Sequence, residues 1–274
     1  QAPDTAALLD KLSQLAEVTG DWQRYVAVLK SVHGYASNGE QLSALGLRIA
    51  GVYAEQLDDV DGALEWNRRV LEDVPGQSDA IGRLEALMQA HERFDELVQF
   101  YEEISFDVTP EERVSYLLKQ GYVKEGKLDD LAGAVEAYRE VLVSAPDNKA
   151  ALGRLDGLLE NPILGLAAVE ILEPIYRQQK DSARLARLLR VKAQEVEGSL
   201  DRSQLLAEAA DLLASTDGGM VDGFETYLQA IKQKQFDTGG SLAAAMGLAA
   251  KLDRWQDLAN VLEQVCMDEL AKEL

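Results

Sequence analysis

Apolar residues recur at intervals of three and four along almost the whole chain. Leu8, Leu12 and Leu15 show this spacing near the start, and residues 185–189 show it again much later. This period is that of an α-helix with one buried face, and no stretch has the strict alternation of a half-buried β-strand. The pattern therefore predicts an all-α fold.

Turn and capping residues interrupt the helical pattern at short intervals, for example at residues 37–39, 74–76 and 216–219. The uninterrupted segments predict helices over residues 4–19, 21–35, 40–56, 59–74, 77–90, 92–106, 110–125, 129–144, 147–160, 163–179, 181–197, 201–215, 219–234, 238–251 and 253–271. The connections are so short that consecutive helices must run antiparallel. We expect stacked helical hairpins, that is, an α-solenoid.

One part of the sequence repeats. Residues 57–65 (LDDVDGALE) return as residues 128–136 (LDDLAGAVE), and Pro75 returns as Pro146, an offset of 71 residues. This offset holds two segments of about 35 residues, the length of one helical-hairpin repeat. Each repeat packs only on its neighbours, so we expect residues 1–274 to form a single domain despite their number.

Several predicted helices open with an aromatic residue. Trp22, Phe94 and Trp255 each stand at such a start and are followed by apolar residues at helical spacing. We expect these rings to wedge against the preceding helix.

These residues resemble a tetratricopeptide repeat (TPR) array of a divergent bacterial type. The small and aromatic positions of that family recur in two helix pairs, at Leu47, Ala50, Tyr53, Ala63, Val70 and Pro75, and at Leu118, Gly121, Ala134, Tyr138, Val141 and Pro146. Residues 40–160 match the family best, residues 161–251 are divergent and include Pro174 inside a predicted helix, and residues 252–274 form a terminal helix. The resemblance implies a right-handed superhelix that binds peptides or protein surfaces on its concave face.

The TPR register implies which side chains line that concave face. Most of them are small, and only Leu118 with Tyr122 offers an apolar and aromatic anchor. The alternative for Tyr122 is packing in the core. The candidate partner-binding residues are Ser115, Leu118, Tyr122, Gln89, Arg83 and Arg154.

Two arginines follow glycines inside predicted helices, in Gly82-Arg83 and Gly153-Arg154. A glycine there costs about 1 kcal/mol relative to alanine, so we expect a gain from close contact between helices. The arginines either bind carboxylates of a partner or cap the ends of neighbouring helices.

The chain is acidic, with 27 Lys and Arg against 48 Asp and Glu, a formal net charge of −21. Such a charge repels nucleic acid and anionic membranes and attracts a basic or amphipathic protein segment. The alternative is that the charge serves only solubility.

Candidate chemistry is sparse. His33 and His91 lie in separate hairpins, where we expect surface or helix-end histidines, and Cys266 is the only cysteine. The acidic runs at residues 58–62 and 129–130 lack the spacing of a calcium loop and fit helix capping instead. We expect no catalytic residue, no metal site and no cofactor.

The sequence thus predicts a non-catalytic protein-binding scaffold. One alternative is a structural spacer that self-associates through its end helices, near Trp255; another is an active site hidden in residues 161–251. The chain starts at Gln1 without an initiator Met, so we expect a fragment of a longer protein. Such a fragment gives no information on whether the longer protein has a signal peptide. No apolar run reaches membrane-spanning length, and we expect a cytoplasmic location.

Overall fold

The computed structural model describes residues 5–106, 108–233 and 240–273, and these form fifteen α-helices. The helices are α1 (Thr5–Thr19), α2 (Trp22–His33), α3 (Gly39–Glu55), α4 (Val60–Asp73), α5 (Ser78–Ala90), α6 (Phe94–Ile104), α7 (Pro110–Gly126), α8 (Leu131–Ser144), α9 (Lys149–Gly157), α10 (Gly165–Gln179), α11 (Ser182–Glu195), α12 (Ser199–Ala214), α13 (Met220–Gln233), α14 (Ser241–Leu252) and α15 (Trp255–Glu273). No β-strand occurs among these residues. The predicted all-α fold is confirmed.

Each predicted helix corresponds to one helix of the structure. The largest difference in the first ten is at α9, which ends three residues before the predicted limit of 160. Asn161 and Pro162 follow a turn there, and proline disfavours helical backbone in the residue before it. The predicted limits at residues 4, 234 and 238 lie outside the described residues.

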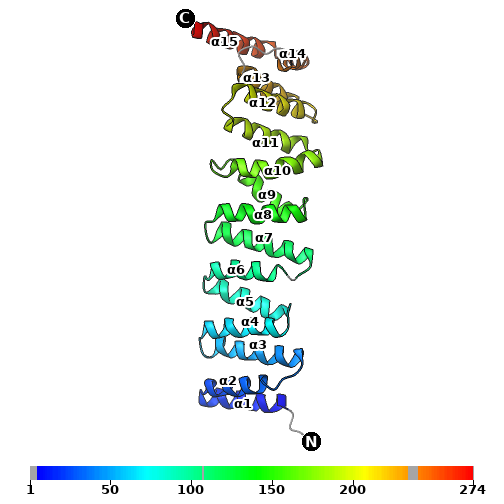
Figure 1. Cartoon of the computed structure of the whole chain (residues 1–274). Coiled ribbons are helices and arrows are strands. Elements are labelled where there is room, and N and C mark those ends of the chain that lie inside the picture. The colour runs from blue at the N-terminus through cyan, green and yellow to red at the C-terminus, as the bar shows by residue number, and fades with distance from the viewer. Residues whose placement is uncertain (1–4, 107, 234–239, 274) are drawn as a thin grey trace. The chain divides into compact units, whose positions relative to one another are not determined.

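The chain divides into two compact units, Gln1–Tyr116 and Leu117–Leu274. Within the first unit, α2 packs on α3, α3 on α4, α4 on α5 and α5 on α6. Within the second, the same neighbour-to-neighbour packing runs from α8 to α15 (Figure 1). This arrangement is compatible with a helical repeat.

Each unit has its own buried core. In the first, Leu29 and Ile49 are fully buried in a cluster with Trp66. In the second, the largest fully buried side chains include Tyr176 and Phe224. Burial of such side chains is the main stabilising contribution to hairpins of this kind.

The repeated sequence produces repeated local structure. We call residues 39–108 (α3–α6) the first copy and residues 110–179 (α7–α10) the second copy. Asp58 and Asp129 turn the chain before α4 and α8 with left-handed φ angles of 51° and 55°. Asp59 and Asp130 then accept a hydrogen bond from the backbone N–H three residues on, at 2.9 and 2.8 Å. The predicted capping role of these acidic residues is confirmed.

Two of the helices that open with an aromatic residue are tied by the arginine before it. Arg254 binds Asp257 through Nε at 2.6 Å and Glu225 of α13 through Nη1 at 2.9 Å. Arg93 makes the corresponding pair of bonds at the start of α6. Trp255, however, is 47% exposed. What the Trp255 ring contacts stays a prediction, and the Arg254 guanidinium is the group that links α15 to α13.

Candidate interaction surface

Helices α7 and α9 bring Tyr122 and Arg154 together. The Arg154 guanidinium lies 5.0 Å from the centre of the Tyr122 ring, and its Nη1 is 3.4 Å from Glu125 Oε1. Tyr122 remains 39% exposed. The structure therefore joins two of the predicted site residues in one surface patch.

The buried side chain of Tyr138 contacts this patch from the interior of the chain. The Tyr138 hydroxyl of α8 donates to Glu125 Oε2 at 2.6 Å, and its ring lies 6.1 Å from that of Tyr122. Burial, and then the hydrogen bond to Glu125, raise the pKa of Tyr138, so it remains a neutral donor. We call Tyr122, Glu125, Tyr138 and Arg154 the Tyr122 cluster.

Space for Tyr138 comes from a glycine on the facing helix. A Cβ on Gly121 would collide with the Tyr138 ring. The expected close contact between helices therefore exists, but at Gly121 rather than at the glycines before the two arginines. Around Gly82 and Gly153 a Cβ would meet nothing within 4 Å, so the contact expected there is wrong.

Arg83 of the first copy binds differently from Arg154. Its Nη1 donates to the backbone carbonyl of Leu47 in the middle of α3 at 2.7 Å. A Cβ on Gly51 would lie 3.6 Å from the same nitrogen, an ordinary van der Waals contact. Neither arginine caps a helix end as the alternative proposed: Arg83 bonds to a mid-helix carbonyl, and Arg154 pairs with a side chain.

The other predicted site residues have less definite surroundings. Gln89 is exposed on α5 and hydrogen-bonds to Tyr101, whose pKa is raised mainly by burial. Ser115 is exposed on α7, and Leu118 is half-buried one turn further on the same helix. Whether these residues contact a partner stays a prediction.

Sequence reasoning missed a recurring contact between a tyrosine and an acid. Tyr176 of α10 donates to Asp156 of α9 at 2.8 Å, and Tyr227 of α13 bonds to Asp211 of α12. In both cases burial first, and then the carboxylate, raise the pKa of the tyrosine. The tyrosine follows its acid by 20 residues in one pair and 16 in the other, so no fixed spacing marks the contact.

The histidines stand at helix ends, as expected, but only His91 is on the surface. His33 is 5% exposed, packs edge-on against Trp66 at 5.2 Å, and lies 3.3 Å from Asp73. Its place is structural. In the described part of the chain no three His, Cys, Asp or Glu side chains gather in a way that could hold a metal ion.

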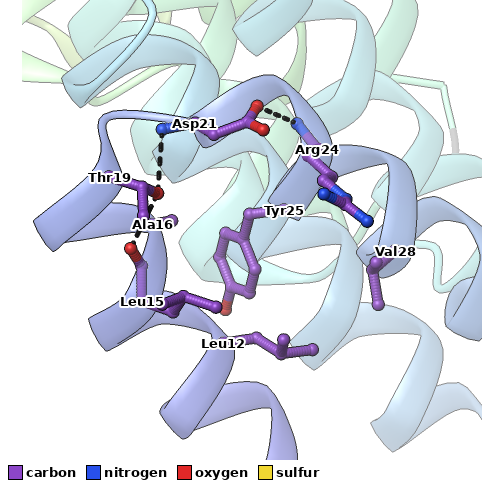
Figure 2. A pocket seen from close by; sticks show the side chains of 8 residues that line it. All are labelled: Leu12, Leu15, Ala16, Thr19, Asp21, Arg24, Tyr25 and Val28. Carbon is purple, nitrogen blue, oxygen red and sulfur yellow. Dashed lines mark hydrogen bonds between the residues drawn. The ribbon is translucent and has the colours of Figure 1, made fainter.

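A hollow of about 370 Å³ lies between α1 and α2. Figure 2 shows Leu12 and Leu15 facing Tyr25 there. The Tyr25 hydroxyl is buried and has no hydrogen-bond partner among the described residues. Aliphatic side chains make up half of the lining.

No protein-family model matches the sequence, and no curated protein matches it. Among the described residues, no helix combines the length and apolar character needed to cross a membrane. The interpretation of the surface therefore rests on its own geometry.

Proposed function

We propose that the chain is a non-catalytic scaffold, a TPR-like right-handed superhelix that binds a basic or amphipathic protein segment at the Tyr122 cluster. The observation that carries this proposal is an exposed tyrosine and arginine beside bare helical backbone. Gly153 and Gly157 lie in α9 on either side of Arg154 in sequence, and a Cβ on either would meet nothing within 4 Å.

No described atom lies within 4 Å of a Cβ at either glycine, so packing within the described residues requires neither. Gly153 lies inside α9, where glycine costs about 1 kcal/mol relative to alanine, and Gly157 is the last residue of that helix. Gly82, the counterpart of Gly153 in the first copy, is equally open. A partner backbone running along α9 would approach closely only where no side chain stands.

The neighbouring side chains suit a binding anchor. Tyrosine and arginine dominate binding energy in protein interfaces, where they are enriched at central positions. Arg154 is already held by Glu125 and by the Tyr122 ring. A side chain ordered before binding loses less conformational entropy when the partner arrives.

Charge favours a basic partner. The chain carries a net charge of −21, which accelerates encounters with a positively charged segment and does so less at high salt. The cytoplasmic location remains a prediction.

The test compares the two copies. Affinity capture followed by mass spectrometry identifies proteins held by the wild-type chain, and Leu118→Ala/Tyr122→Ala should lose at least about tenfold of that signal, a free-energy change of about 1.4 kcal/mol. Leu47→Ala changes the counterpart of Leu118 in the first copy and is the matched control. Equal capture by the double variant and the wild type would show that the Tyr122 cluster binds nothing.

A second candidate function is a spacer that self-associates through its end helices. Exposed apolar side chains on both favour it: Leu15 and Val18 on α1 are 56% and 85% exposed, and Trp255 and Met267 on α15 are 47% and 64% exposed. Sedimentation across concentration should show reversible dimers or larger species that Val18→Ser or Trp255→Ser removes. A monomer at every concentration would rule this candidate out.

A further inference from the structure

An apolar groove of about 410 Å³ lies between α4 and α6 in the first copy. Leu71 of α4, Ile81 of α5 and Ile104 of α6 line it together with Val108, and Phe100 is also part of the lining. All four aliphatic side chains are half-buried, so each keeps some surface open to solvent. The groove shares no residue with the Tyr122 cluster.

The rim of the groove is negative. Glu72 and Glu103 line it along with one cation, Arg68, whose Nη1 is 3.8 Å from Glu103 Oε2. Glu72 has no ion-pair partner in the part of the chain that the structure describes. In addition, α4 ends at Asp73 and α6 at Ile104, so the groove adjoins two helix C-termini, which attract positive charge.

The second copy has different side chains at the same place. Gln179 stands where the first copy has Val108, and its Nε2 donates to the carbonyl of Pro146 at 3.2 Å. Pro146 is the counterpart of Pro75. A hollow of about 320 Å³ lies beside Gln179, and two basic residues, Lys149 and Arg184, are part of its lining.

The two rim carboxylates are also missing from the second copy. Val143 replaces Glu72, and Pro174 replaces Glu103. An apolar lining with a negative rim is therefore specific to the first copy and does not follow from the repeat.

We propose that the α4–α6 groove binds an amphipathic basic segment of a partner protein. An apolar side chain of that segment lies on Ile104 and Val108, and a Lys or Arg side chain next to it pairs with Glu72 and Glu103. The partner is basic because the carboxylates and the two helix ends outnumber the single guanidinium of Arg68. This groove is a second binding surface, separate from the one proposed on α7 and α9.

The test uses a labelled synthetic peptide of Leu and Lys at helical spacing, titrated into the full chain by fluorescence anisotropy. Val108→Gln reproduces the second copy and should donate across the groove to the Pro75 carbonyl. We expect Val108→Gln to raise the dissociation constant of the peptide at least about tenfold. Glu72→Val should raise it by a similar factor at low salt and leave it unchanged at high salt. Circular dichroism checks that each variant stays folded.

Three controls make the result specific. Glu55→Val removes one carboxylate at the end of α3, outside the groove, and should change affinity less than about twofold. A peptide with Ser in place of Leu keeps the charge and should bind weakly. In a chain that already carries Tyr122→Ala, which removes the anchor of the other proposed surface, Val108→Gln should still weaken binding at least about tenfold, and this separates the two proposals.

Several outcomes would overturn the proposal. Binding that Val108→Gln leaves intact, or a Ser peptide that binds as well as the Leu peptide, would reduce the effect to general attraction by an acidic protein. Weakening by Tyr122→Ala but not by Val108→Gln would assign the peptide to the Tyr122 cluster. A chain that dimerises in sedimentation, and becomes monomeric with Val108→Gln, would assign the groove to a second copy of the chain.

Discussion

Arg154 in the second copy stacks on Tyr122 and pairs with Glu125, whereas its counterpart in the first copy, Arg83, reaches past Gly51 to a backbone carbonyl of α3. The helices and turns around the two arginines correspond. What differs is the group that each arginine meets, two side chains for Arg154 and a backbone carbonyl for Arg83. The repeat therefore determines the helices and turns. A few substitutions determine that the second copy has an exposed aromatic side chain at Tyr122 where the first copy has Gly51.

The interior shows a matching exchange. Tyr138 is fully buried in the second copy beside Gly121, and the first copy has Asn67 and Ala50 at these places. The large Tyr138 ring thus faces a glycine, and the copy with the smaller amide has an alanine in place of that glycine. A larger side chain opposite a smaller one is the direction that close packing favours.

The largest effect expected from this difference concerns Tyr138. Tyr138→Ala removes a fully buried ring and its bond to Glu125, and should lower the free energy of unfolding by about 3–5 kcal/mol. Asn67→Ala at the equivalent position should cost about 1 kcal/mol, because among the described residues the Asn67 side chain hydrogen-bonds only to the Ala63 carbonyl of its own helix. Urea denaturation measures both values, and equal losses would contradict the comparison.

The second prediction concerns glycines with opposite surroundings. Gly121→Ala should destabilise by about 1–3 kcal/mol, because the new methyl group collides with the Tyr138 ring. Gly153→Ala should instead stabilise the free chain by about 1 kcal/mol, since its Cβ meets nothing and alanine favours helix. Thermal unfolding of both variants checks the signs. Destabilisation by Gly153→Ala would mean that close packing at α9 has been missed.

The fold was readable from the sequence to a larger extent than the site. Helical spacing and turn residues gave all fifteen helices, and the acidic residues before α4 and α8 were correctly expected to cap them. Those signals are local. The partners of Arg83 and Arg154 depend on residues more than twenty positions away, and no local pattern distinguishes Gly121, which meets a ring, from Gly153, which meets nothing.

The third prediction is a dependence on alkaline pH. The ordinary pKa of tyrosine is 10.0, and burial raises the pKa of Tyr138 in the folded chain. A group whose pKa is higher in the folded state stabilises it fully below pH about 10, and this contribution is lost as the pH rises further. Tyr138→Phe should therefore make the fall in stability above pH 10 less steep, as followed by circular dichroism. An unchanged slope would show that Tyr138 ionises freely.

The smallest effect concerns the arginines themselves. Arg154 is 51% exposed and Glu125 is 23% exposed, so Arg154→Ala should cost less than about 1 kcal/mol, with part of the loss absent at high salt. Arg83→Ala, which removes a bond to a neutral carbonyl, should depend less on salt. Urea denaturation at two ionic strengths compares them. The same salt dependence for both would mean that the Glu125 pair adds nothing.

We propose above all that the second copy carries a binding surface that the first copy lacks. The most direct measurement is the affinity of a captured partner for the chain with Tyr122→Gly/Glu125→Ala, which gives α7 the residues of the first copy, measured by isothermal titration calorimetry. We predict a loss of at least about a hundredfold in affinity, or about 2.8 kcal/mol, in a chain that remains folded. Unchanged affinity in that folded variant would contradict the claim.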